Sequence, residues 1–179
     1  MPKFDNRFDI NSFLNKLAQI ESSGGKDFSH REIASGLHEG DRAIGRYGLM
    51  PNTVQEINRR EIAGGKIDPE MVSAAQLPHD EMKRYLEANP DLEQRFAQAY
   101  AQHLRDKFPG DEERMAYGWT MGPSRPSPSA TQLDQSDYVN KFRRINEMIK
   151  NRQLLENAQE KPLESRMGDV KMADEDEED

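Results

Sequence analysis

The sequence predicts a mainly helical protein with one long irregular loop near its N-terminal end and a disordered acidic tail. Three observations lead to this class. Apolar residues recur three and four positions apart through most of residues 9–157, which is the spacing of amphipathic helices. Glycines and prolines divide that pattern into short segments. The last twenty of the 179 residues hold nine acids and three bases, and so carry −6 of the net charge of −8. We expect one domain over 1–158 and the tail over 159–179.

The first helix is expected over residues 9–20, because one stripe of apolar residues runs along it. That stripe consists of Ile10, Phe13, Leu14, Leu17 and Ile20. Two serines and two glycines at 22–25 end the helix, since such residues tolerate the left-handed conformation at a helix C-terminus. Glu21 therefore falls at or next to the last turn.

Residues 26–50 are rich in glycine and charge and show no sustained helical period. We expect an ordered loop there, with room for a short β-hairpin. Loops of this length inside compact domains are uncommon and usually functional. A second helix is expected from Pro51 to the glycines at 64–65, since proline fits a first helical turn. Its stripe would be Val54, Ile57 and Ile62.

The rest of the domain is expected to be helical, for a total of six or seven helices. Segments open at Asp68, where Asp can cap and Pro69 fits the first turn, and again at 80–88. A strong stripe follows, formed by Leu92, Phe96, Ala99, Tyr100 and Leu104. A short helix is expected over 112–120. Three prolines favour an irregular loop over 122–132. The last helix, marked by Tyr138, Phe142, Ile145, Met148 and Ile149, would run to about residue 157.

Several classes of function are disfavoured by composition. The chain has no cysteine, and its four histidines show no metal-ligand spacing, so we expect no metal or other cofactor. Basic residues are interspersed with acidic ones, which disfavours a nucleic-acid partner. No apolar stretch approaches the ~18–20 residues of a membrane span, and no signal-peptide pattern is visible. We therefore expect a protein without a membrane span.

Glu21 is the first candidate for chemistry. A carboxyl beside the end of an apolar helical stripe is poorly placed to ionise, because desolvation and the negative end of the helix dipole both raise its pKa. Such a carboxyl can stay protonated near neutral pH and act as a general acid. The plain alternative is a solvated glutamate on a surface helix.

Four motifs occur in an order that carries a resemblance. They are ESSGG from Glu21, AIGRYGLMPNT from Ala43, AYGWTMGP from Ala116 and YVNK from Tyr138. In this order and spacing the chain resembles the soluble lytic transglycosylases of the lysozyme-like superfamily, over about residues 9–150. The resemblance implies a lysozyme-like domain that cleaves the β-1,4 bond between N-acetylmuramic acid and N-acetylglucosamine in peptidoglycan.

The resemblance also implies roles for individual residues. Glu21 would act first as acid and then as base, drawing the muramyl 6-hydroxyl into a 1,6-anhydro ring. Ser22 would lie near the reacting sugar, and Tyr138 would help to position the carboxyl of Glu21. The segment that would line the glycan cleft is Gly48, Leu49 and Met50.

The chain departs from the family pattern at two places. Pro51 stands where the family has a glutamine after its GLM segment, and Thr120 stands opposite the asparagine of the AYNAG-like motif. A sugar contact through either position is therefore in question. Trp119, the only tryptophan, offers either a stacking face for a sugar ring or a core side chain.

Two alternative functions remain open. The stretch that contains Asp41 also resembles goose-type lysozymes, in which an aspartate ahead of GLM helps to place a water. If Asp41 faced Glu21, it could serve as the base of an inverting hydrolase. The bland alternative pairs Asp41 with Arg42, Arg46 or solvent. The other function is that of a structural virion protein that kept the fold and lost activity.

The expected substrate lies outside the cytoplasm. A bacteriophage origin would reconcile this with the missing signal, because virion-associated wall-cleaving enzymes are delivered to the host periplasm from outside. The alternative is a cytoplasmic enzyme with non-classical release. The expected partners are peptidoglycan glycan strands. The tail over 159–179 is expected to be a solvated extension or a docking peptide for other virion proteins.

Overall fold

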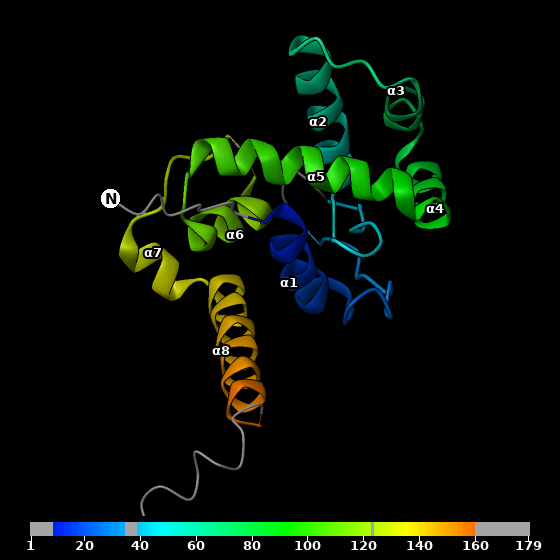
Figure 1. The fold of residues 1–179 in the computed structure, drawn as a ribbon. Coiled ribbons are helices and arrows are strands. Elements are labelled where there is room, and N and C mark those ends of the chain that lie inside the picture. Colours follow the sequence, from blue (N-terminus) through cyan, green and yellow to red (C-terminus); the bar gives the residue numbers. More distant parts are fainter. Residues whose placement is uncertain (1–8, 35–38, 123, 160–179) are drawn as a thin grey trace, which may run out of the picture. The chain divides into compact units, whose positions relative to one another are not determined.

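The structure is a computed structural model that describes residues 9–34, 39–122 and 124–159. Within these ranges it contains eight α-helices and no β-sheet, which confirms the mainly helical class (Figure 1). The helices are α1 (Ile10–Ser22), α2 (Pro51–Ala63), α3 (Pro69–Ala75), α4 (His79–Ala88), α5 (Pro90–Lys107), α6 (Glu112–Met121), α7 (Ala130–Gln135) and α8 (Asp137–Gln159). Apart from Gln159, the predicted tail over 159–179 lies outside the described residues.

Helix α5 is the centre of the packing. It contacts α1, α2, α3, α4 and α6, and its course between the other helices can be followed in Figure 1. Four residues of its predicted stripe are buried, and these are Leu92, Phe96, Tyr100 and Leu104. Burying one side chain of this kind contributes about 1.5–3 kcal/mol. The helices that carry the candidate site are therefore held by one shared core.

Helix α1 begins and ends close to the predicted positions. The Asp9 carboxylate caps it by accepting a hydrogen bond from Asn11 N at 2.9 Å. Ser23 follows the last turn in the left-handed conformation, with φ 51°. On its apolar face Phe13, Leu14 and Leu17 are fully buried, and Ile10 and Ile20 are partly buried. The last turn of α1, which contains Glu21, is therefore fixed against the core.

The loop between α1 and α2 contains no strand in its described part. Two isolated antiparallel bridges hold it instead, one between Glu32 and Arg42 and one between Ile44 and Leu49. Ile44 N donates to Leu49 O at 2.8 Å. The loop is thus ordered by single bridges, by turns and by side chains from the helices.

The structure differs from the sequence prediction in the burial of Ile62, in the proline-rich loop and in the number of helices, eight against an expected six or seven. Ile62 was expected to be buried in α2, but its side chain is 41% exposed. The proline-rich loop over 122–132 was expected to be wholly irregular, but α7 begins within it. At the start of α7, Gln132 N donates a hydrogen bond to Ser129 Oγ at 3.2 Å, and Ser129 N donates one to Gln132 Oε1 at 2.8 Å. This capping box starts a helix directly after the last proline. It accounts for the eighth helix.

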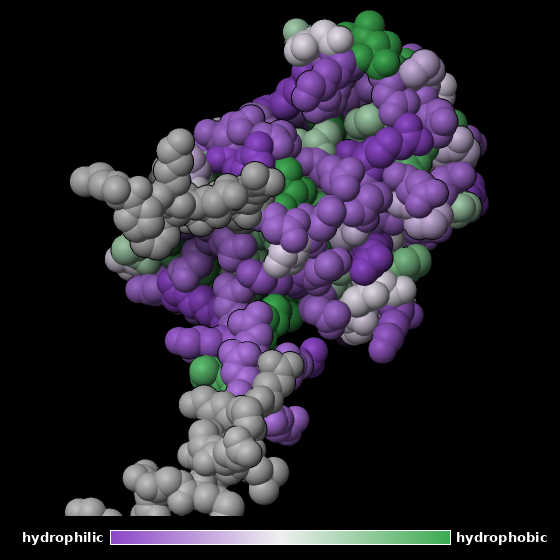
Figure 2. All heavy atoms as spheres, in the orientation of Figure 1, coloured by the Kyte–Doolittle hydropathy of each residue, from purple (hydrophilic) through white to green (hydrophobic). Residues whose placement is uncertain are grey.

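The described chain divides into a unit that ends at Ile145 and a second that begins at Asn146. In the second unit Met148 and Ile149 were expected to be part of a buried stripe, but both are exposed. Across the described ranges no helix is long and apolar enough to cross a membrane. The face shown in Figure 2 is mostly hydrophilic, with hydrophobic residues in small separate spots, in keeping with the mean hydropathy of −1.00.

Candidate active site

The carboxyl of Glu21 lies in the last turn of α1, as the sequence predicts. Burial raises its pKa from 4.5 to about 7, and this outweighs the lowering effects of Tyr138 and Lys141. About half of these carboxyls are therefore protonated at neutral pH. The group can deliver a proton and take one back, which is what a general acid and base must do.

A tight turn at residues 45–48 provides the other wall of the site. The Ile44–Leu49 bridge closes it, and both of its glycines have positive φ, 56° at Gly45 and 64° at Gly48. The Glu21 carboxyl lies directly against Gly48: a Cβ at that position would be only 2.5 Å from Glu21 Cδ. Only glycine fits here, both because of its backbone conformation and because any side chain would displace the carboxyl.

Side chains from α1 and α6 hold the peptide groups of the 45–48 turn. Ser22 Oγ donates to Arg46 O at 2.7 Å, and Trp119 Nε1 donates to Tyr47 O at 3.0 Å. Both side chains are nearly buried, with exposed fractions of 2% and 6%. The helix that carries Glu21 is thus tied directly to the turn that receives its carboxyl.

Gly45 is held at both of its peptide groups. Its carbonyl oxygen accepts a hydrogen bond from His30 Nε2 at 2.9 Å. Its N–H donates to the Glu87 carboxylate of α4 at 3.0 Å. Lys83 also bonds to Glu87, so this contact belongs to a partly exposed ion pair.

A buried carboxyl, Glu93 of α5, lies on the far side of the turn, and the sequence reasoning missed it. Its side chain is 2% exposed, and it accepts a hydrogen bond from Tyr47 N at 3.1 Å. Burial raises its pKa to about 7, against the lowering effect of the Tyr47 and Arg46 N–H groups. A signal was present, because positions 93, 97, 100 and 104 follow the helical period of the core-facing stripe.

Tyr138 stands in the first turn of α8 with its hydroxyl buried. The hydroxyl is close enough to lower the pKa of Glu21, but it falls short of full hydrogen-bond geometry toward the carboxyl. Burial and the neighbouring Glu21 together raise the pKa of Tyr138 well above 10. Tyr138 is therefore a neutral hydroxyl beside the candidate acid, and its role in positioning Glu21 stays a prediction.

The other predicted binding residues differ in their surroundings. Trp119 belongs to the core: its ring lies 4.7 Å from that of Tyr100, between centroids. Of its two expected roles, core packing describes it. Leu49 is also buried, at 1% exposure, whereas Met50 is half-buried and Thr120 is exposed. The sugar contacts assigned to these residues and to Ser22 stay predictions.

Asp41, the proposed second carboxylate, forms a hydrogen bond with a residue that the sequence analysis did not pair with it. His79 Nδ1 lies 2.7 Å from Asp41 Oδ1. This histidine opens α4, far along the chain, so spacing could not reveal the pair. The pairing occupies one oxygen of the carboxylate that the hydrolase alternative needs. Among the described residues no three acids or histidines are grouped to hold a metal ion.

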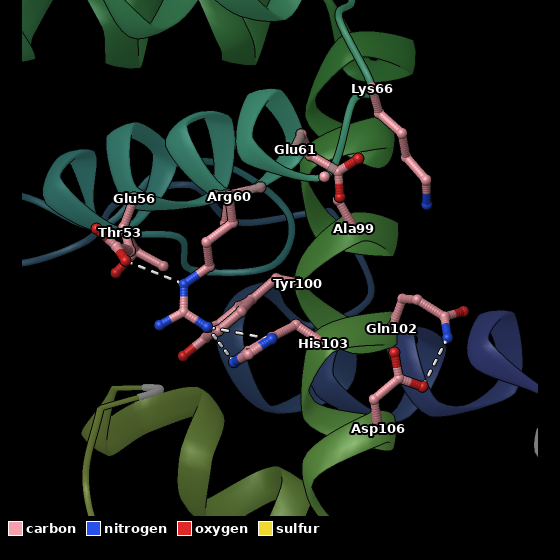
Figure 3. A pocket seen from close by; sticks show the side chains of 12 residues that line it. Thr53, Glu56, Arg60, Glu61, Lys66, Ala99, Tyr100, Gln102, His103 and Asp106 are labelled. Atoms are coloured by element: carbon pink, nitrogen blue, oxygen red, sulfur yellow. Dashed lines mark hydrogen bonds and ion pairs between the residues drawn. The ribbon is translucent and has the colours of Figure 1, made fainter.

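A separate pocket of about 180 Å³ lies between α2 and α5 (Figure 3). Charged side chains line much of it, and two of them, Arg60 and Glu56, form an ion pair. Arg60 donates to Glu56 at 3.0 Å and also contacts the ring of His103. Glu21 does not line this pocket. This pocket is therefore separate from the candidate site.

No family model, curated protein or solved structure matches this chain.

Proposed function

We propose that this protein is a peptidoglycan lytic transglycosylase with a lysozyme-like domain over residues 1–158. One observation carries the proposal: the half-buried carboxyl of Glu21, with a pKa of about 7, packs directly against Gly48, where a side chain would displace it. The four motifs support it, because the residues of the first two form this contact. The buried hydroxyl of Tyr138, from the fourth motif, lies beside the same carboxyl.

In the proposed reaction Glu21 is used twice. Its carboxyl proton passes to the glycosidic oxygen as the bond to the muramyl C1 breaks, and the substrate's acetamido group stabilises the positive centre. The resulting carboxylate then takes the proton of the muramyl 6-hydroxyl, whose oxygen bonds to C1. The products are a 1,6-anhydromuramyl end and a free N-acetylglucosamine end, and Glu21 is protonated again. One carboxyl with a pKa near 7 suits both steps.

Digestion of purified sacculi tests the reaction directly. We expect soluble muropeptides that end in 1,6-anhydromuramic acid, identified by liquid chromatography and mass spectrometry. Reducing-end muramic acid would instead indicate a hydrolase and would bring Asp41 back as the base. Undigested sacculi would favour a structural protein over either enzyme.

The rate should fall as pH rises through 7. Glu21 must be protonated to act as the acid, and burial raises its pKa to about 7. The rate of sacculus clearing should therefore drop about tenfold between pH 6 and pH 8. Turbidity assays at constant ionic strength measure this. A rate that holds up to pH 9 would mean that a group other than Glu21 supplies the proton.

A further inference from the structure

We infer that Glu93 is a positioning residue, which holds the 45–48 turn in the conformation that seats the carboxyl of Glu21. Its effect on catalysis rests on the proposed function, whereas its effect on the Glu21 carboxyl does not. Glu93 is outside the four motifs that point to the activity.

Both oxygens of the Glu93 carboxyl contact the 45–48 turn. One oxygen accepts the hydrogen bond from Tyr47 N. The carboxyl also packs against Gly45 so closely that a Cβ there would lie 2.5 Å from Glu93 Oε2. The turn therefore rests on this carboxyl at two of its four residues.

Burial makes this contact hard to replace. With 2% of Glu93 exposed, no open solvent can take over the hydrogen bond from Tyr47 N. A buried N–H that loses its acceptor is costly. Glu87 also supports the turn, but it is partly exposed and shared with Lys83, so water can substitute for it. Of the two carboxyl groups that hold the turn, Glu93 is therefore the one that water cannot replace.

The contact reaches Glu21 through one peptide link. Tyr47, which bonds to Glu93, directly precedes Gly48, on which the carboxyl of Glu21 rests. Glu21 itself stands on α1, whose caps at Asp9 and Ser23 do not involve Glu93. Loss of Glu93 therefore moves the turn while the acid keeps its place on the helix. Displacements of about 1 Å in a catalytic group can cost about a hundredfold in rate.

The carboxyl of Glu93 also suits this place as a hydrogen-bond acceptor. The N–H groups of Tyr47 and Arg46 both lower its pKa, because they stabilise the carboxylate form, whose two oxygens only accept hydrogen bonds. An amide keeps one acceptor but turns an NH₂ group toward backbone donors. Glu93→Gln therefore keeps the volume of the side chain and disturbs the turn.

The test compares Glu93→Gln with Asp91→Asn, which removes the same charge from an exposed position of α5. We expect Glu93→Gln to lower kcat on sacculi by about 10- to 100-fold with KM within about twofold. Asp91→Asn should leave both within twofold. Circular dichroism checks that each variant is folded at the assay temperature.

A second readout needs no enzymatic activity. Glu21 owes its raised pKa first to burial, so a loosened turn should admit water and shift that pKa toward 4.5. Carbon-13 NMR of labelled glutamate carboxyls measures it, with Glu21→Gln identifying the signal. If the pKa shifts but wild-type protein cleaves no glycan, the proposed function fails and the positioning role stands. If neither kcat nor the Glu21 pKa changes in Glu93→Gln, the positioning role is overturned.

Glu93→Asp covers the case in which Glu93→Gln does not fold. It keeps the charge but is shorter by one methylene, so its carboxyl withdraws from Tyr47 N. We expect kcat and the Glu21 pKa of Glu93→Asp to lie between those of the wild type and those of Glu93→Gln. If the length of the side chain alone matters, both values should fall as far as in Glu93→Gln. Wild-type values for both in folded Glu93→Asp would contradict the inference.

Discussion

Glu21→Gln is expected to abolish cell-wall cleavage, with a loss of about 10³- to 10⁴-fold in kcat. One group performs both proton transfers in the proposed reaction, and each is worth about 10²–10⁴. The amide keeps the size of the side chain but can neither donate the proton nor take it back. Turnover of labelled sacculi measures the loss, with the exposed Glu147→Gln as the control. Undiminished turnover in Glu21→Gln would contradict the proposed mechanism in both its lyase and its hydrolase form.

The same substitution should stabilise the protein at high pH. The folded-state pKa of Glu21, about 7, lies above its ordinary value of 4.5, so folding takes up a proton between these two pH values. Stability from this group is thus present below pH 4.5 and is lost as pH rises to 7. Each pKa unit corresponds to about 1.36 kcal/mol, and partial exposure reduces the total to about 1–2 kcal/mol.

Urea unfolding at two pH values measures this effect. Glu21→Gln should be more stable than the wild type at pH 8, with a smaller difference at pH 5. The raised pKa of Glu93 is common to both proteins and cancels in the comparison. An equal difference at both pH values would mean that Glu21 ionises normally in the folded protein.

Gly48→Ala should remove activity and weaken the fold. Its methyl carbon would lie within 2.5 Å of Glu21 Cδ, and the backbone there has φ 64°. The left-handed conformation alone costs a non-glycine residue about 1–2 kcal/mol. Displacement of the carboxyl adds to this cost, so we expect about 2–4 kcal/mol in unfolding free energy and at least about a hundredfold in kcat.

Gly65→Ala is the matched control for Gly48→Ala. Gly65 also has positive φ, 79°, but a Cβ there would meet no atom within 4 Å. It should lose only the backbone component, about 1–2 kcal/mol, and keep full kcat. Equal losses of stability and activity in the two variants would mean that strain, and not the contact with Glu21, accounts for the effect of Gly48→Ala.

Local signals made much of the helical pattern predictable. Asp68 and Pro69 start α3 as expected, and Asp68 accepts hydrogen bonds from the N–H groups of Glu70 and Met71. The Ser-Ser-Gly-Gly segment ends α1 and leaves Glu21 in its last turn. These outcomes depend on neighbours within about one helical turn, which a sequence displays directly. The capping box of α7 is also a local signal, and it starts a helix although prolines precede it.

Burial was less predictable than helix position. Ile62 continues an apolar pattern, yet its side chain stays 41% exposed. Glu93 has a charged side chain, yet it is buried because the backbone N–H groups of a distant turn compensate it. Whether a residue is covered depends on which elements pack against it, and the helical period alone does not contain that information.

Local sequence patterns predict the helices around the site and the place of Glu21 at the end of an apolar helix. The contacts of that carboxyl depend on tertiary packing. Gly48 follows Glu21 by 27 positions. The backbone N–H and C=O of Tyr47 form hydrogen bonds with Glu93 and Trp119, which are 46 and 72 positions away. Helix ends follow from neighbouring residues, whereas these contacts arise from packing α1, α5 and α6 around one turn. That packing partly buries Glu21 and raises its pKa to about 7.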